Sequence, residues 1–138
     1  MSISAAALLF GVVFIVAGLA GFFASPPPVD APPLTVDHGH GLALGIFPVN
    51  TLHNVVHLLF GVLGLVASRS LAGARTYFRV VAVAYVLLAV LGLLPATQTA
   101  FGLVPIWGPD VYLHGAIALV ALYFGFVAPA TAEGVRRV

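Results

Sequence analysis

Two pairs of ionisable side chains repeat the same spacing in separate apolar segments of the sequence. His53 and His57 form the first pair, and Asp110 and His114 form the second. Residues four positions apart lie on one face of a helix, so both members of a pair can reach the same metal ion. Imidazole and carboxylate ligands suit zinc, copper, iron or manganese. These four residues are therefore a candidate metal site.

Two other interpretations of the same residues remain open. The histidines can form a structural clasp in which they hydrogen-bond to one another, to Asp110 or to water. Alternatively, His57 and His114 can be the two axial ligands of a haem or another tetrapyrrole held in an apolar slot. The phenylalanines expected to line such a slot are Phe47, Phe60 and Phe101.

Several polar neighbours can support this cluster. Asn50, Asn54 and Tyr112 are close enough in sequence to hydrogen-bond the imidazoles and fix their orientation. Asn50 is also a good N-cap for the helix that carries the first histidine pair. His38 and His40, in the preceding connection, can add or deliver a further ligand.

The elements that must position these residues are transmembrane helices. The chain has 138 residues, of which 62% are hydrophobic and 7% charged. A globule this small cannot hide so much apolar surface from water, whereas a bilayer can. Four segments are apolar enough to span it, at about residues 4–24, 51–68, 77–94 and 111–128. We therefore expect one all-α domain over residues 1–138, an integral membrane four-helix bundle.

The arginines predict how these spans are oriented. All five lie in the second connection, at its flanks or in the C-terminal tail, namely Arg69, Arg75, Arg79, Arg136 and Arg137. The positive-inside rule assigns this side to the cytoplasm, together with both termini of a chain with an even number of spans. The histidines then lie at the outer face.

The two halves of the sequence align with each other. Gly45-Ile-Phe-Pro-Val matches Gly102-Leu-Val-Pro-Ile, and the same register pairs His57 with His114. The first and third spans also match, but with an offset that is fourteen residues larger than the offset between the two motifs. This alignment pairs four residues of the first span with four of the third, namely Gly11 with Ala82, Phe14 with Tyr85, Gly18 with Ala89, and Gly21 with Gly92. We expect two tandem hairpins related by a pseudo-two-fold axis along the membrane normal. Small residues beside the polar ones predict that the second and fourth spans pack against each other.

The segment Gly45-Ile-Phe-Pro-Val-Asn-Thr-Leu-His-Asn-Val-Val-His-Leu-Leu-Phe-Gly61 resembles the signature of the DUF4383 family. The resemblance covers nearly the whole chain, including a glycine-rich first span and an arginine-bearing inner loop. The second family motif reads Asp-Asn-Trp-Leu-His, and here it is Asp110-Val-Tyr-Leu-His114, so the Asn and Trp are replaced. The resemblance implies a small four-helix protein of the bacterial cytoplasmic (inner) membrane, and it supplies no activity.

Composition also limits the function. A net charge of +1 without any lysine gives no basic face for nucleic acid, and the absence of cysteine excludes thiol catalysis. With one carboxylate and no serine near the histidines, we expect no hydrolytic enzyme and no catalytic residues. We expect a non-catalytic protein of the lipid bilayer, such as an accessory subunit that packs on other membrane-protein subunits or on copies of itself. Its His/Asp cluster would join the two hairpins. The alternative is a protein that binds a metal or a haem at that cluster.

Overall fold

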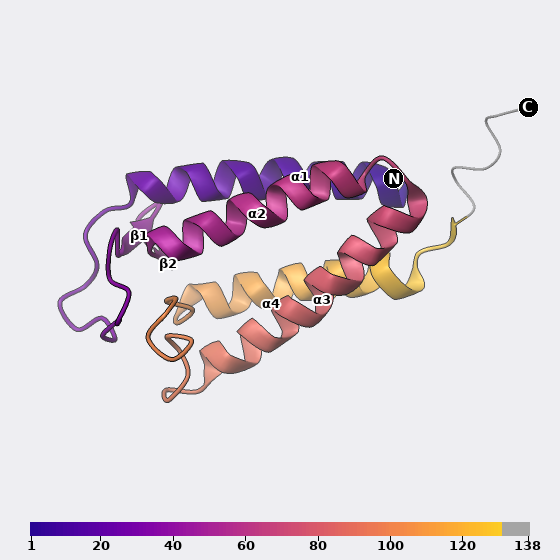
Figure 1. The fold of residues 1–138 in the computed structure, drawn as a ribbon. Coiled ribbons are helices and arrows are strands. Elements are labelled where there is room, and N and C mark those ends of the chain that lie inside the picture. Colours follow the sequence, from indigo (N-terminus) through magenta and orange to yellow (C-terminus); the bar gives the residue numbers. More distant parts are fainter. Residues whose placement is uncertain (131–138) are drawn as a thin grey trace, which may run out of the picture.

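The computed structural model describes residues 1–130, which fold into helices joined by two longer connections at one end (Figure 1). The helices are α1 (Ile3–Ala20), α2 (Thr51–Ala67), α3 (Leu71–Leu93) and α4 (Pro109–Leu122). A 3₁₀ turn, Gly21–Phe23, extends α1, and a π-helical turn, Tyr123–Val127, extends α4. Arg136 and Arg137, which entered the orientation argument, lie outside the described residues.

The fold is mostly helical, and three of its helical segments are long and apolar enough to cross a membrane. These are Ile3–Phe23, Leu71–Leu93 and Pro109–Val127. The remaining helix, α2, is also apolar but has 17 residues. The all-α expectation missed a small antiparallel ribbon between α1 and α2, formed by strands β1 (Gly41–Ala43) and β2 (Phe47–Val49).

The third helix begins before the expected start of the third span at residue 77. Ser70 is its N-cap, and the Ser70 hydroxyl accepts a hydrogen bond from the Gly73 amide at 3.0 Å. Arg75 and Arg79 therefore lie inside α3. Both donate to backbone carbonyls near the end of α4, Arg75 to Ala128 at 2.7 Å and Arg79 to Gly125 at 3.0 Å. These guanidinium groups satisfy carbonyls that the helix end leaves unpaired.

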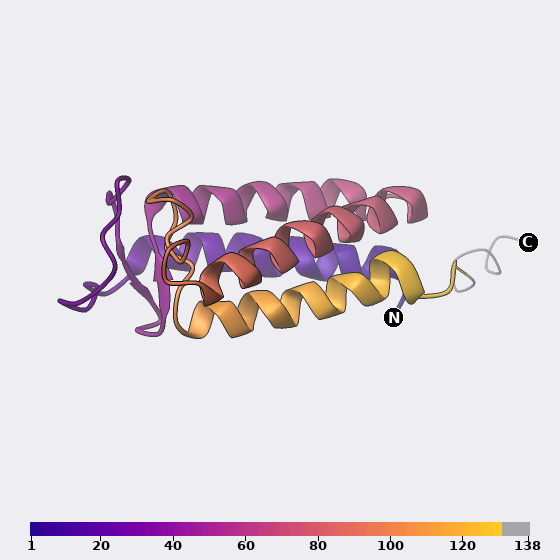
Figure 2. The same ribbon diagram turned by 90° about the horizontal axis from the view of Figure 1, so that it is seen from below.

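The helices pack as two antiparallel pairs, α1 along α2 and α3 along α4 (Figures 1 and 2). Between the pairs, the most extensive backbone contacts join α1 to α3 and α2 to α3. The expectation that the second and fourth spans pack directly was therefore wrong at the level of the backbone. Imidazole side chains of the two helices nevertheless meet between them, because ring nitrogens of His53, His57 and His114 lie within 4.8 Å of one another.

Glycines bring α1 and α2 unusually close together. A Cβ atom added to Gly11 would lie 2.8 Å from the Leu65 amide nitrogen and 2.9 Å from the Gly61 carbonyl oxygen. A Cβ atom on Gly64 would lie 2.9 Å from the Cα of Gly11. Small residues allow such contact where no hydrophobic effect drives helices together in lipid.

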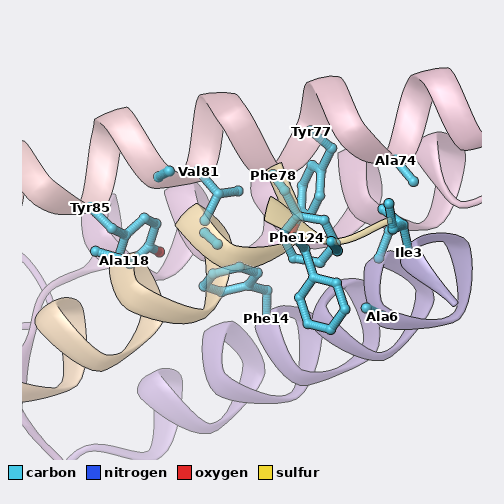
Figure 3. Close-up of a cluster of buried hydrophobic side chains, with 14 residues drawn as sticks. Ile3, Ala6, Phe14, Ala74, Tyr77, Phe78, Val81, Tyr85, Ala118 and Phe124 are labelled. Carbon is cyan, nitrogen blue, oxygen red and sulfur yellow. The ribbon is translucent and has the colours of Figure 1, made fainter. Parts of the chain in front are cut away.

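An aromatic core fills the space between the two pairs (Figure 3). Phe78 of α3 stacks on Phe124 with ring centroids 5.0 Å apart, and it meets the edge of Phe10 of α1 at 5.1 Å. Toward the outer connections, Phe14 of α1 and Tyr85 of α3 pack at 5.5 Å. These two rings form the floor beneath the polar residues described next.

Candidate metal centre

Asn50 holds the start of α2 in place beneath the outer connections. It is fully buried, and its side-chain oxygen accepts a hydrogen bond from the His53 amide at 2.8 Å, as expected for an N-cap. Its side-chain nitrogen donates to the carbonyl of Val36 at 2.7 Å and to that of Leu103 at 2.8 Å. One amide therefore joins α2 to both long connections.

The two connections also bond directly to each other. The amides of Thr35 and Val36 both donate to the carbonyl of Gly102, at 2.8 Å and 3.0 Å. Gly102 has φ of +86°, a left-handed conformation that glycine adopts without strain. We call these contacts, together with those of Asn50, the outer strap. The strap ties the N-terminal half of the chain to the C-terminal half.

Three histidines meet beneath the strap, and we call them the histidine trio. His53 and His57 project from α2, and His114 projects from α4. One ring nitrogen of each lies within 4.8 Å of the corresponding atoms of the other two. The ring centroid of His53 lies 4.6 Å from that of His57 and 6.0 Å from that of His114. The i, i+4 spacing thus does bring both α2 imidazoles to one place.

Asp110 lies beside the trio at the first turn of α4. Its Oδ2 is 3.4 Å from the Nε2 of His114, but the two atoms are not aligned as a hydrogen bond. Within residues 1–130 the group with metal-ligand geometry consists of the three histidines without Asp110. The carboxylate is therefore a close neighbour of His114 and not a member of the group with metal-ligand geometry.

The trio is buried, and most of its ring nitrogens have no hydrogen-bond partner in the described part of the chain. The exposed fractions are 4% for His53, 8% for His57 and 1% for His114. Four of their ring nitrogens have no hydrogen-bond partner among the described residues, namely His53 Nδ1, His57 Nε2, and Nδ1 and Nε2 of His114. A buried polar atom without a partner costs about 1–3 kcal/mol. A ligand bound between the three imidazoles would give these unpaired ring nitrogens a partner.

Aromatic rings support two of the imidazoles from below. The ring of Phe14 lies 5.6 Å from that of His57, and Tyr85 meets His114 edge-on at 5.0 Å. Sequence reasoning did not assign these rings to the site, although the repeat register already paired them with each other. Of the three phenylalanines expected to line a haem slot, Phe101 is instead exposed, because it lies in a turn at the surface.

Tyr112 does not orient the imidazoles, and that expectation was wrong. Its side chain is 79% exposed. It lies two residues from both Asp110 and His114, and two residues correspond to about 200° around a helix, so it faces away from them. Asn54 is buried, but it packs against Gly21, where an added Cβ would overlap its amide. No hydrogen bond joins Asn54 to a histidine in the part of the chain that the structure describes.

The two histidines of the first connection lie outside the trio. His38 forms two hydrogen bonds with Thr51. Its ring Nδ1 lies 2.9 Å from the Thr51 hydroxyl, and its backbone carbonyl accepts a hydrogen bond from the Thr51 amide, also at 2.9 Å. These bonds hold the start of α2 in place. The amide of His40 donates to the carbonyl of Asp37 at 2.8 Å. Burial lowers the pKa of the His40 imidazole, and the Asp37 carboxylate opposes part of this shift. His40 is therefore neutral at neutral pH.

Comparison with known proteins identifies a family and no characterised relative. Residues 4–127 match a family described as a domain of unknown function (DUF4383). No curated protein and no solved structure matches the chain.

Proposed function

The chain belongs to the DUF4383 family of unknown function, and we propose that it is a membrane protein that binds one transition-metal ion through the histidine trio. The observation that carries this proposal is three buried imidazoles whose ligand atoms lie within 4.8 Å of one another, with four of their six ring nitrogens lacking a hydrogen-bond partner among the described residues. Metal–nitrogen bonds of about 2.0–2.1 Å would require these atoms to close in by roughly 1 Å. Rotation of the side chains supplies such a movement.

A structural clasp explains the trio less well. A clasp stabilises through hydrogen bonds between its members, and the described members make none with each other. The outer strap already joins the two halves through Asn50 and Gly102. The histidines are therefore not needed to join the two halves, and their imidazoles can bind a metal ion instead. The clasp remains the second candidate function, favoured by the 3.4 Å approach of Asp110 to His114.

A single ion also fits the site better than a tetrapyrrole does. The cavities bordered by His53 and His57 have volumes of about 140 Å³ and 160 Å³. Drug-sized ligands occupy pockets of roughly 300–1,000 Å³. A haem between His57 and His114 would in addition have to displace His53, whose ring lies close to both.

We also propose that the bundle consists of two tandem hairpins related by a pseudo-two-fold axis along the membrane normal. The turns that precede the two motifs support this. Leu44 and Gly45 have φ of 55° and 70°, and their counterparts Phe101 and Gly102 have φ of 60° and 86°. Two successive positions that share an uncommon backbone conformation in both halves favour duplication over chance.

Contacts within each hairpin support the same proposal. Phe14 packs on His57 as its counterpart Tyr85 packs on His114. Gly21 abuts Asn54, and its counterpart Gly92 abuts Val111, where an added Cβ would lie 2.9 Å from Val111 Cγ2.

We further propose four spans in a bacterial cytoplasmic membrane, with both termini and Arg69 on the inner side and the trio near the outer face. The chain has no cysteine, so single cysteines can report this orientation. In right-side-out vesicles an impermeant maleimide is expected to label Val29→Cys in intact vesicles. It should label Ala72→Cys only after the vesicles are permeabilised. Both positions are exposed, Val29 in the first long connection and Ala72 in the first turn of α3, at the opposite end of the bundle. Labelling with the reverse pattern would contradict the orientation.

Metal binding is tested on the full chain purified without a histidine tag. We expect about one equivalent of iron, copper, zinc or manganese by elemental analysis, either as purified or after reloading. At a free metal concentration of 100 times the Kd, the metal should stabilise the protein by about 2.7 kcal/mol. His57→Ala and His114→Ala should lose both the metal and this stabilisation.

His38→Ala is the matched control for these variants, because His38 lies outside the trio. It should keep its metal, and circular dichroism should show that all three variants retain their helix content. The proposal fails if the wild-type chain takes up none of these metals. It also fails if His38→Ala and His114→Ala lose metal equally.

A further inference from the structure

Two small cavities flank the histidine trio at opposite helix interfaces. The first, of about 140 Å³, lies between α1, α4 and the ribbon, and Ala17 and Phe47 are in its wall. The second, of about 160 Å³, lies between α2, α3 and the second long connection, and Val56 is in its wall. His53 and His57 border both cavities. Each cavity therefore leads to the same imidazoles from a different side.

The walls of both cavities are apolar away from the site itself. Apart from the histidines and Asp110, the first is lined by Ala, Leu, Phe and Val residues. In the second, the remaining lining residues are Val, Leu and Ile together with Tyr85. An ordered water needs two to four polar partners, and an apolar cavity of about 150 Å³ stays dry and takes up xenon or benzene. These cavities are suited to a small apolar guest.

The cavities occupy equivalent positions in the two halves. Under the repeat register, four wall residues of the first correspond to residues at the second interface, namely Ala17 to Leu88, Phe47 to Val104, Val49 to Ile106, and Leu113 to Val56. All eight line their respective cavities. A packing defect at one of these two interfaces between the hairpins would not be expected to recur at the other. The duplication therefore indicates a retained feature of the fold.

We propose that these cavities admit a neutral, lipid-soluble diatomic ligand, of the class of dioxygen and nitric oxide, to the metal held by the histidine trio. The inference rests on the proposed metal site. One end of such a ligand coordinates the ion, while the other occupies apolar space that offers it no competing hydrogen bond. Leu44 and Leu113 line the first cavity and are also exposed at the surface of the molecule, so a ligand dissolved in the surrounding lipid would have only these side chains to pass.

This ligand class restricts the metal. Zn²⁺ has a filled d shell and no redox chemistry, so it does not form stable complexes with dioxygen or nitric oxide. Fe²⁺ and Cu⁺ bind such ligands. The proposal therefore favours iron or copper over zinc at the trio.

The first test uses xenon and needs no metal. Crystals of the metal-free protein under xenon pressure are expected to show one xenon atom in each cavity beside His53. Val56→Phe should remove the xenon between α2 and α3, and Ala17→Leu should remove the one between α1 and α4. Leu119→Phe, on the exposed face of α4, is the matched control and should leave both. Absence of xenon from both wild-type cavities would overturn the proposal.

The second test measures nitric oxide binding to protein loaded with Fe²⁺. We expect an iron–nitrosyl signal in electron paramagnetic resonance, formed in the wild type and in Leu119→Phe at the same rate. The double variant Ala17→Leu/Val56→Phe should bind nitric oxide at least tenfold more slowly at unchanged iron content. Equal rates in the double variant and the wild type would overturn the proposal.

The two tests separate this inference from the proposed function. A chain that takes up xenon but no metal contradicts the metal site and leaves the cavities as sites for an apolar molecule, without the metal chemistry proposed for them. A chain that binds iron without xenon or nitric oxide supports the metal site and contradicts the ligand class.

Discussion

Replacing Asn50 with leucine is expected to destabilise the protein by about 3–6 kcal/mol. Three backbone groups lose their partners, which would cost about 3–9 kcal/mol if all three were fully buried, and two of the three are only partly buried. These groups are the His53 amide and the carbonyls of Val36 and Leu103. Leucine has nearly the shape of asparagine, so the loss reports hydrogen bonding and not volume. Reversible unfolding in mixed micelles, followed by circular dichroism, measures the change in the free energy of unfolding.

Asn54→Leu is the matched control for this substitution. Asn54 lies one turn further along α2 and is equally buried, but its side-chain oxygen has no partner among the described residues. Removing a buried amide that makes no hydrogen bond is expected to be neutral or stabilising. Similar losses for Asn50→Leu and Asn54→Leu would show that the strap contributes nothing beyond packing.

Replacing Gly11 with valine is expected to destabilise the pairing of α1 with α2 by about 3 kcal/mol. An added Cβ would lie 2.8–2.9 Å from the backbone of α2 at Leu65 and Gly61, and helical backbone atoms cannot move aside as a flexible side chain does. The helices must therefore separate along much of their length. The same unfolding measurement, together with protease sensitivity of the loop between α2 and α3, detects this separation.

Gly115→Ala, in α4, also replaces a helical glycine, but this substitution is expected to stabilise the protein and not to destabilise it. A Cβ at Gly115 has no atom within 4 Å, so alanine meets no obstacle there. Alanine is expected to stabilise the helix by up to about 1 kcal/mol relative to glycine. Destabilisation by Gly115→Ala equal to that by Gly11→Val would contradict the close contact of α1 with α2.

Much of the fold was predictable from hydropathy and proline positions, because lipid forces apolar segments to satisfy their backbone groups as helices. The ribbon was not, because its strands Gly41–Ala43 and Phe47–Val49 are three residues each and carry no periodic pattern. The start of α3 was missed for a similar reason. The predicted span begins at residue 77 and leaves Arg75 outside, because a charged side chain interrupts the apolar pattern, whereas both Arg75 and Arg79 form hydrogen bonds inside the bundle.

Within the site, helical periodicity predicted the proximity of His53 to His57, and the repeat register predicted that His114 would join them. Tyr112 was expected near the imidazoles because it is close to His114 in sequence. Its angular position around α4 instead decides which way its side chain faces, and it faces away from the trio. The roles of Phe14, Tyr85 and Asn50 depend on packing between halves of the chain. Asn50 was recognised as a cap, but its bonds to Val36 and Leu103 span up to 53 residues, and no local pattern encodes them.

The outer strap also sets a time scale. Four hydrogen bonds, two from Asn50 and two to Gly102, must open before a charged species from outside can pass between the connections. Side chains rotate in picoseconds to nanoseconds, but opening of bonded backbone is local unfolding and takes microseconds to seconds. An ion beneath the strap is thus expected to enter or leave toward the connections no faster than the strap opens. Exchange of the metal would then be governed by local unfolding of the strap and not by rotation of single side chains.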